Sequence, residues 1–129
     1  MHTLPSKVRR ADRHAKEYIN RSDCKVGMYA EIVRGGAILS RGYNKRDFKN
    51  YSIHAEVNAL KQLVRQKNGA EGATMTIIRY LADDSFGASK PCPQCMSAIR
   101  RAGIKRINYF NYDGDFCSDR VAVEMRGYK

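Results

Sequence analysis

The stretch His54-Ala55-Glu56 and the later stretch Pro91-Cys92-Pro93-Gln94-Cys95 decide how this chain is interpreted. One imidazole and two thiolates are ligands that a catalytic zinc ion takes, with its fourth position left open for water. Glu56 follows the histidine closely enough to move protons without binding the metal. We therefore predict that His54, Cys92 and Cys95 bind Zn²⁺ and that Glu56 is the catalytic acid and base.

A Cys-x-x-Cys pair on its own has other uses. It occurs as a redox pair, or as half of a structural zinc site that needs a fourth Cys or His at regular spacing. The remaining candidates lie far upstream, alone near the end of the chain, or in its basic beginning: Cys24, Cys117, His2 and His14. The sequence favours catalytic zinc, with structural zinc and redox chemistry as alternatives.

The size and composition indicate one domain over residues 1–129, long enough for a sheet covered by helices. The sequence has no long apolar run, and its Met1–Lys7 start is polar. Two of the four cysteines are assigned to metal, which argues against a disulfide framework. We expect a cytoplasmic protein that is not associated with a membrane.

The chain is strongly basic. Lys and Arg total 24 against 13 Asp and Glu, a formal net charge of +11. Such an excess attracts polyanions or phosphorylated small molecules, although solubility alone is an equally simple explanation. The basic residues are spread along the chain, which indicates affinity for phosphate and no reading of base sequence.

Three segments have helical periodicity. Residues from Ser6 to Asn20 predict an amphipathic helix with Val8, Ala11, Ala15, Tyr18 and Ile19 on its apolar face. Residues from His54 to Lys67 predict a second helix, stopped by Asn68-Gly69, with an apolar face formed by Ala55, Ala59, Leu60, Leu63 and Val64. Residues from Pro93 to Ala102 predict a third, with Pro93 in its first turn and Gly103 as its C-terminal cap.

The segments between them predict strands and loops. Lys25–Val33 and Ala37–Gly42 form a hairpin at Gly35-Gly36, and Ala73–Leu81 is a central strand. Asn44–Ser52 and Asp83–Lys90 are loops. Arg106–Tyr112 is a strand that turns at Asp113-Gly114 into a returning strand over Arg120–Arg126. This order predicts an α/β fold with a mixed sheet and helices packed on it.

Both metal-binding stretches stand at the starts of predicted helices. The partial positive charge of a helix N-terminus lowers the pKa of a thiol and favours the thiolates that zinc needs. Two such helices side by side on one sheet bring the three ligands to one ion. N–H groups left unpaired in their first turns are then available to ligand oxygens.

Several stretches resemble the cytidine and deoxycytidylate deaminase superfamily, whose zinc signature is His-x-Glu followed by Pro-Cys-x-x-Cys. Its deoxycytidylate branch is the most similar. The resemblance covers about residues 24–112 and is carried by these stretches: Lys25-Val26-Gly27, Ile38–Asn44 ending in Gly-Tyr-Asn, His54–Leu60, Glu71–Met75, and Pro91–Cys95 continuing to Ala102–Lys105.

The resemblance implies an α/β/α sandwich around a five-stranded sheet, zinc as cofactor, and a homo-oligomer. It also implies that Asn44 bonds the sugar or base and that the Ala55 backbone N–H holds the pyrimidine carbonyl. Lys45, Arg46 and Lys49 follow Asn44 and are candidate phosphate contacts, with a solvated loop as the alternative. Two features depart from the deoxycytidylate branch. The Ala82–Lys90 stretch is longer, and the short tail predicts a hairpin ending similar to that of free-cytidine deaminases.

The expected function is hydrolytic deamination of a cytosine nucleotide or nucleoside, with conversion of dCMP to dUMP as the first choice. A second possibility is deamination of cytosine or adenine in single-stranded nucleic acid or tRNA, where the base is drawn into the pocket. A third is an inactive nucleic-acid-binding module on the same fold. Glu56 argues against the third, because a module that needs only the fold has no use for that carboxylate.

Overall fold

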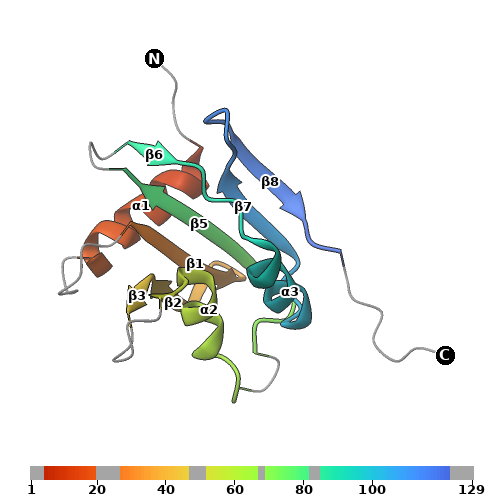
Figure 1. Ribbon diagram of the computed structural model, residues 1–129. Coiled ribbons are helices and arrows are strands. Elements are labelled where there is room, and N and C mark those ends of the chain that lie inside the picture. The colour runs from red at the N-terminus through yellow and green to blue at the C-terminus, as the bar shows by residue number, and fades with distance from the viewer. Residues whose placement is uncertain (1–4, 20–26, 47–51, 67–68, 82–84, 123–129) are drawn as a thin grey trace.

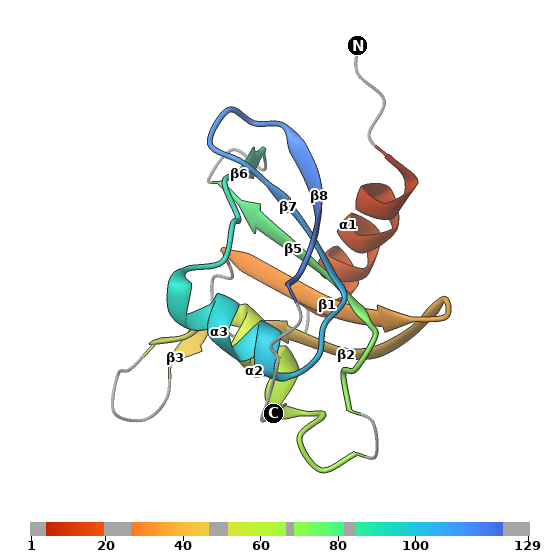
Figure 2. The same ribbon diagram turned by 90° about the vertical axis from the view of Figure 1, so that its right-hand side faces the viewer.

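A mixed β-sheet separates two helical layers in the computed structural model (Figure 1), which describes residues 5–19, 27–46, 52–66, 69–81 and 85–122. Helix α1 (Ser6–Ile19) covers one face, and α2 (Ala55–Lys61) and α3 (Pro93–Arg101) cover the other (Figure 2). This arrangement confirms the predicted α/β fold with helices on both faces. No helix within the described ranges has the length and apolar character needed to cross a bilayer.

The main sheet has the strand order β2 (Ala37–Tyr43), β1 (Met28–Arg34), β5 (Thr74–Tyr80), β7 (Arg106–Phe110) and β8 (Phe116–Arg120). The β5–β7 pair is parallel and the other pairs are antiparallel. A short sixth strand, β6 (Phe86–Gly87), pairs with the end of β5 in a segment predicted as loop. Two further short strands, β3 (Lys45–Arg46) and β4 (Ser52–Ile53), pair where irregular chain was predicted.

The first hairpin turns where the sequence predicts. Gly35 and Gly36 have φ of 59° and 81°, the left-handed region that glycine adopts without strain. The last strand begins earlier than predicted. The returning strand is predicted over Arg120–Arg126, but β8 begins at Phe116, ends at Arg120 and runs antiparallel to β7, and residues 123–126 lie outside the described residues. The Asn111 side chain accepts the N–H bonds of Asp113 and Asp115, so the turn is tight and pairing resumes at once.

Helices α1 and α3 agree closely with the sequence. Val8, Ala11 and Ala15 are fully buried against the sheet, whereas the side chains of Tyr18 and Ile19 lie outside the described residues. Pro93 occupies the first turn of α3, and Gly103 follows its end with a φ of 83°. Both ends therefore have the residues that the backbone geometry requires.

Helix α2 is shorter than the predicted His54–Lys67 helix. Regular helix ends at Lys61, and the chain continues in turns closed by bonds such as Leu63 N–H to the Leu60 carbonyl. Bonds three residues apart tighten the chain and shift the periodicity of its faces. As a result Leu63 remains buried, but Val64 is 77% exposed, contrary to its predicted place on the apolar face.

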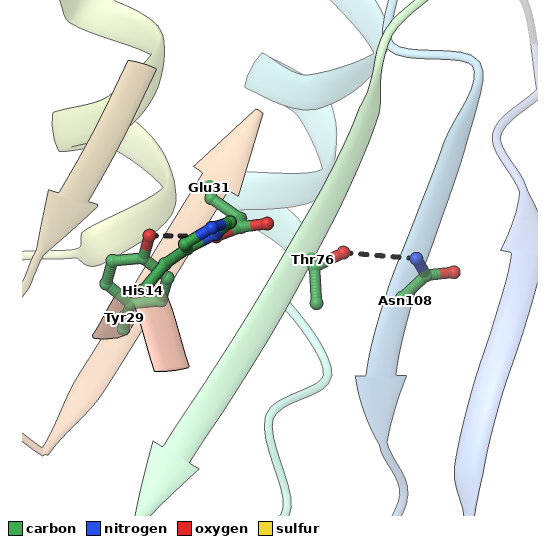
Figure 3. Close-up of polar contacts among 5 residues, drawn as sticks. All are labelled: His14, Tyr29, Glu31, Thr76 and Asn108. Atoms are coloured by element: carbon green, nitrogen blue, oxygen red, sulfur yellow. Dashed lines mark hydrogen bonds and ion pairs between the residues drawn. The ribbon is translucent and has the colours of Figure 1, made fainter. Parts of the chain in front are cut away.

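Buried polar contacts attach α1 to the sheet. The Glu31 carboxylate accepts a hydrogen bond from the Tyr29 hydroxyl at 2.9 Å and lies 3.0 Å from His14 Nδ1 (Figure 3). Glu31 is 3% exposed. Burial raises the pKa of Tyr29, and the nearby Glu31 carboxylate raises it further. His14, one of the spare metal-ligand candidates, is therefore paired on the α1 face, across the sheet from α2 and α3.

The opposite face of the sheet contains most of the apolar core. Ala30, Ile32, Met75 and Ile77 from the central strands pack against Ala55 and Ala59 of α2. The small side chains of Ala55 and Ala59 let α2 approach the sheet closely. The helix packs mainly on β2 and β1. Both stretches that are predicted to bind zinc lie on this side.

Replacing Gly42 with alanine is expected to destabilise the fold by about 3 kcal/mol, the upper part of the range for overpacking. A Cβ atom on Gly42 would lie 2.5 Å from the Ala59 nitrogen and 2.6 Å from the Ala55 oxygen, both backbone atoms of α2. The helix must move to admit it. Urea unfolding measures the change.

The matched control for this prediction is Gly27→Ala, because a Cβ at Gly27 meets nothing within 4 Å. Its unfolding midpoint should stay close to that of the wild type. Equal midpoints for Gly42→Ala and Gly27→Ala would show that β2 and α2 are not packed as tightly as described.

Candidate metal centre

Two helix starts bring the three predicted ligands together. His54 immediately precedes α2, Cys92 immediately precedes α3, and Cys95 lies in the first turn of α3. The His54 Nδ1 atom lies 3.2 Å from the Cys95 Sγ atom and 3.9 Å from the Cys92 Sγ atom. All three ligand atoms lie within 4.8 Å of one another. The structure therefore places these three side chains as one potential metal-binding group.

The backbone at both helix starts leaves these side chains free. His54 and Cys92 have extended backbone conformations, with ψ of 149° and 166°, and neither side chain caps its own helix. Their carbonyls accept the first helical bonds, from Asn58 and Met96. An N-cap residue whose side chain is not used for capping can direct it elsewhere, here toward the neighbouring helix.

Glu56 lies buried beside this group. Its side chain is 2% exposed, and its Oε1 atom has no hydrogen-bond partner among the described residues. Burial raises the pKa of the Glu56 carboxyl, whereas its own backbone N–H, His54 and Cys95 lower it. A buried carboxylate oxygen without a partner is rare, because leaving it unpaired is unfavourable. This oxygen is thus an available acceptor next to the ligand atoms.

The three predicted ligands differ in exposure. Cys95 is 2% exposed, Cys92 is half-buried, and His54 is exposed, so the group opens to solvent on the histidine side. Burial raises the pKa of Cys95, and the nearby Glu56 and Cys92 raise it further. A divalent cation would relieve this crowding of acidic groups. One imidazole, two sulfurs and an unpartnered carboxylate oxygen therefore fit zinc with an open position.

Polar side chains that the sequence analysis did not identify fasten α2 to the sheet. The Ser40 hydroxyl donates to the Ala59 carbonyl at 2.9 Å, and the Asn58 side chain donates to the Tyr43 carbonyl at 3.0 Å. These bonds fix the helix that follows His54. The available signal was Ser40 directly after the apolar run Ala37–Leu39, although sequence alone did not show which backbone it meets.

The predicted substrate contacts have different surroundings. The Asn44 side-chain oxygen accepts the N–H bonds of Gly27 and Met28, at 3.2 and 2.9 Å, so its NH₂ group is the part left for a ligand. Ala55 is buried at the start of α2. The backbone of Lys45 and Arg46 forms β3, but their side chains lie outside the described residues. Cys24 and Lys49 also lie outside them.

Comparison with known proteins agrees with this geometry. The family model of the cytidine and deoxycytidylate deaminase zinc-binding region matches residues 2–111 of the chain. That match includes both helix starts and the strands beneath them.

Curated relatives are of more than one kind. The chain is 30% identical over 103 residues to a tRNA-specific adenosine deaminase of Streptococcus pyogenes, covering 79% of this chain and 58% of the relative. It is 39% identical over 57 residues to the deoxycytidylate deaminase of Enterobacteria phage T4, covering 44% of this chain and 24% of the relative. The chain thus spans little more than half the length of the first relative and a quarter of the second.

Solved structures share the fold. The dCMP deaminase of cyanophage S-TIM5 superposes with a TM-score of 0.62 at 24% identity, covering 85% of this chain and 86% of that one. A cytidine deaminase from Burkholderia pseudomallei superposes with a TM-score of 0.63 at 15% identity, covering 92% and 94%.

Proposed function

Because this chain belongs to the cytidine and deoxycytidylate deaminase family, we propose that it catalyses zinc-dependent hydrolytic deamination of a cytosine nucleotide or nucleoside, with dCMP as the preferred substrate. Water and the cytosine ring give the uracil ring and ammonia. The observation that carries this proposal is the cluster of His54, Cys92 and Cys95 with the unpartnered carboxylate oxygen of Glu56 beside it.

The proposed ligands of zinc are His54, Cys92 and Cys95. A zinc ion bound by one imidazole and two thiolates supplies Lewis-acid chemistry that makes water a nucleophile near neutral pH. Cys95 would hold the ion at the buried side of the group, and the exposed side of His54 leaves room for substrate to enter. The two sulfurs and Glu56 together would favour a divalent cation at this place.

Glu56 is the proposed proton carrier. Its carboxylate takes a proton from the attacking water and gives it to the ring nitrogen, while the oxygen bonds the amino-bearing carbon. Glu56 then takes the remaining proton from the newly added hydroxyl and gives it to the amino group, the carbon–nitrogen bond breaks, and ammonia leaves as the uracil carbonyl forms. Its burial keeps bulk water away from these transfers, and its position in the first turn of α2 keeps the carboxylate fixed.

Further residues are proposed to bind the substrate. The Asn44 NH₂ group would bond the sugar or base, and the Ala55 N–H would hold the pyrimidine carbonyl. Lys45 and Arg46 would contact the phosphate of a nucleotide. The preference for dCMP is supported by the Gly42-Tyr43-Asn44 stretch and by the similarity to a phage deoxycytidylate deaminase.

A second candidate is deamination of a base within tRNA or single-stranded nucleic acid. Similarity to a tRNA-specific adenosine deaminase over 79% of the chain favours it. So does the outer surface of α1, where Lys7, Arg9, Arg10 and Arg13 are exposed. A cationic surface of this kind binds a phosphate backbone and makes affinity fall steeply with salt.

One assay panel separates the two candidates. Zinc-loaded protein is incubated with dCMP, CMP, deoxycytidine, cytidine, single-stranded oligonucleotides and tRNA, and ammonia or the deaminated base is measured. The first proposal predicts turnover of the free pyrimidines, highest with dCMP. Turnover of the polynucleotides alone, weakened by salt, would replace it with the second. No turnover with any of them would favour a binding module.

We also propose that the chain forms a homo-oligomer. A groove of about 690 Å³ lies between α2 and α3, and Val64 at its side is 77% exposed. A second copy covering this groove would remove that apolar side chain from water. Sedimentation velocity should give more than the monomer mass for the wild type, and Val64→Glu should shift it toward the monomer. A wild-type monomer at assay concentrations would contradict the proposal.

A further inference from the structure

The parallel ladder between β5 and β7 stops before either strand ends. The last pair is Thr76 with Asn108, although β5 continues to Tyr80 and β7 to Phe110. Beyond that pair, Ser89 from the following segment stands between the two strands. We call this place the fork; its two sides are Ile77 of β5 and Phe110 of β7.

Three hydrogen bonds join Ser89 to both sides of the fork. Its hydroxyl donates to the Ile77 carbonyl at 2.8 Å and accepts the Phe110 N–H at 3.0 Å. Its own N–H donates to the Phe110 carbonyl at 2.8 Å. Ser89 is 1% exposed, so water does not replace these bonds easily. One side chain thus satisfies a donor and an acceptor that the interrupted ladder would leave unpaired.

The segment around Ser89 is tied to the same two strands at further points. Just before it, β6 pairs with the end of β5, and the Phe86 ring stacks on the Phe110 ring with centroids 4.9 Å apart. Just after it come Pro91, which is buried, and Cys92. Proline fixes its own φ, so little slack separates the fork from the first thiol of the metal centre.

We propose that Ser89 is a positioning residue of the metal centre, whose hydroxyl holds the fork together and thereby sets where Cys92 and α3 meet His54. The inference rests on the proposed zinc function. Serine suits the fork because a single hydroxyl can donate and accept at once. Alanine would leave the Ile77 carbonyl and the Phe110 N–H unpaired, and the Cys92 segment would be free to move relative to α2.

A residue that only stabilises the fold would lower the melting temperature and leave the metal geometry unchanged. The test therefore measures cobalt(II), whose visible absorption reports thiolate ligation and geometry without any turnover. The variants are Ser89→Ala and Ser89→Thr, which keeps the hydroxyl. The matched control is Thr76→Val, which removes a buried hydroxyl from the same strand pair, where Thr76 accepts a bond from Asn108 at 3.1 Å.

The expected result is a loss of cobalt affinity of about 10–100-fold in Ser89→Ala, the range for residues that support metal ligands. Its absorption spectrum should change as well. Ser89→Thr should recover most of the affinity, and Thr76→Val should match the wild type. Wild-type affinity and spectrum in Ser89→Ala would overturn the inference, even if that variant melts at a lower temperature.

A measurement on the wild type covers the case in which Ser89→Ala does not fold. By linkage, if the Ser89 bonds strengthen metal binding, metal binding must strengthen those bonds by the same factor. Zinc should therefore slow hydrogen exchange of the Phe110 amide about 10–100-fold. Unchanged exchange would overturn the inference. A wild-type protein that shows no cobalt–thiolate absorption would instead refute the zinc proposal itself.

Discussion

Glu56→Gln is expected to lower kcat about 10²–10⁴-fold, the usual contribution of general acid–base catalysis, while the protein keeps its zinc. Glutamine has nearly the same shape and can fill the same buried place, but it cannot accept the proton from water. Glu56 is not one of the proposed ligands, so the metal content should not fall. Steady-state deamination of dCMP and metal analysis of the same sample measure both quantities.

The matched control is Glu17→Gln, which changes the same functional group at an exposed position of α1, on the other face of the sheet. It should leave kcat unchanged. Rapid turnover in Glu56→Gln would show that another group carries the protons. Loss of zinc in that variant would show that the carboxylate binds the metal, and the assigned roles would have to be exchanged.

Cys95→Ala is expected to lose zinc and, with it, all measurable deamination. This thiol is the most buried of the three proposed ligands, and it lies 3.2 Å from His54 Nδ1. A residue that only supports a ligand typically changes metal affinity by about 10–100-fold. Removal of the Cys95 thiol should weaken zinc binding by more than that. Zinc content after dialysis against a chelator, followed by the dCMP assay, measures the effect.

Cys117→Ala is the matched control, because Cys117 is a half-buried free thiol on β8 and is not part of the ligand group. It should retain one equivalent of zinc and normal turnover. If Cys95→Ala kept its zinc under the same dialysis, the metal would be held elsewhere, and the proposed centre would be wrong.

Much of the fold follows from local sequence patterns. The periodicity of α1, the proline and glycine that bound α3, and the glycine pair between β1 and β2 are each sufficient to predict their elements. These features depend on neighbours in the chain, and the structure confirms all of them. The family resemblance and the zinc signature are likewise matched by the comparison with known families.

Other parts of the fold were not predictable from local patterns. Val64 has the right spacing for the apolar face of α2, but the helix ends before it, so the side chain turns outward. The β6 strand exists because it meets the free end of β5, a partner that its own two residues do not reveal. The position of β8 was set by the turn at Asn111 and not by the apolar pattern further on.

The same division applies to the site. The sequence predicted which residues bind zinc and move protons, and those roles remain predictions to be tested. It also placed Asn44 at the substrate, whereas the structure shows its side-chain oxygen already engaged with Gly27 and Met28. Ser89 lies in a stretch predicted as loop, and nothing in that stretch distinguishes it from a solvent-exposed serine.

The sequence by itself determined the chemistry available to this protein: the kinds of ligand, their order, and the helix starts that present them. These are properties of residue type and of short-range backbone preference. The tertiary structure alone decided that imidazole and sulfur meet within 4.8 Å, that the Glu56 carboxylate is buried beside them, and that Ser89 joins two strands. Such distances depend on how distant segments pack on one sheet, and that packing is a property of the whole chain.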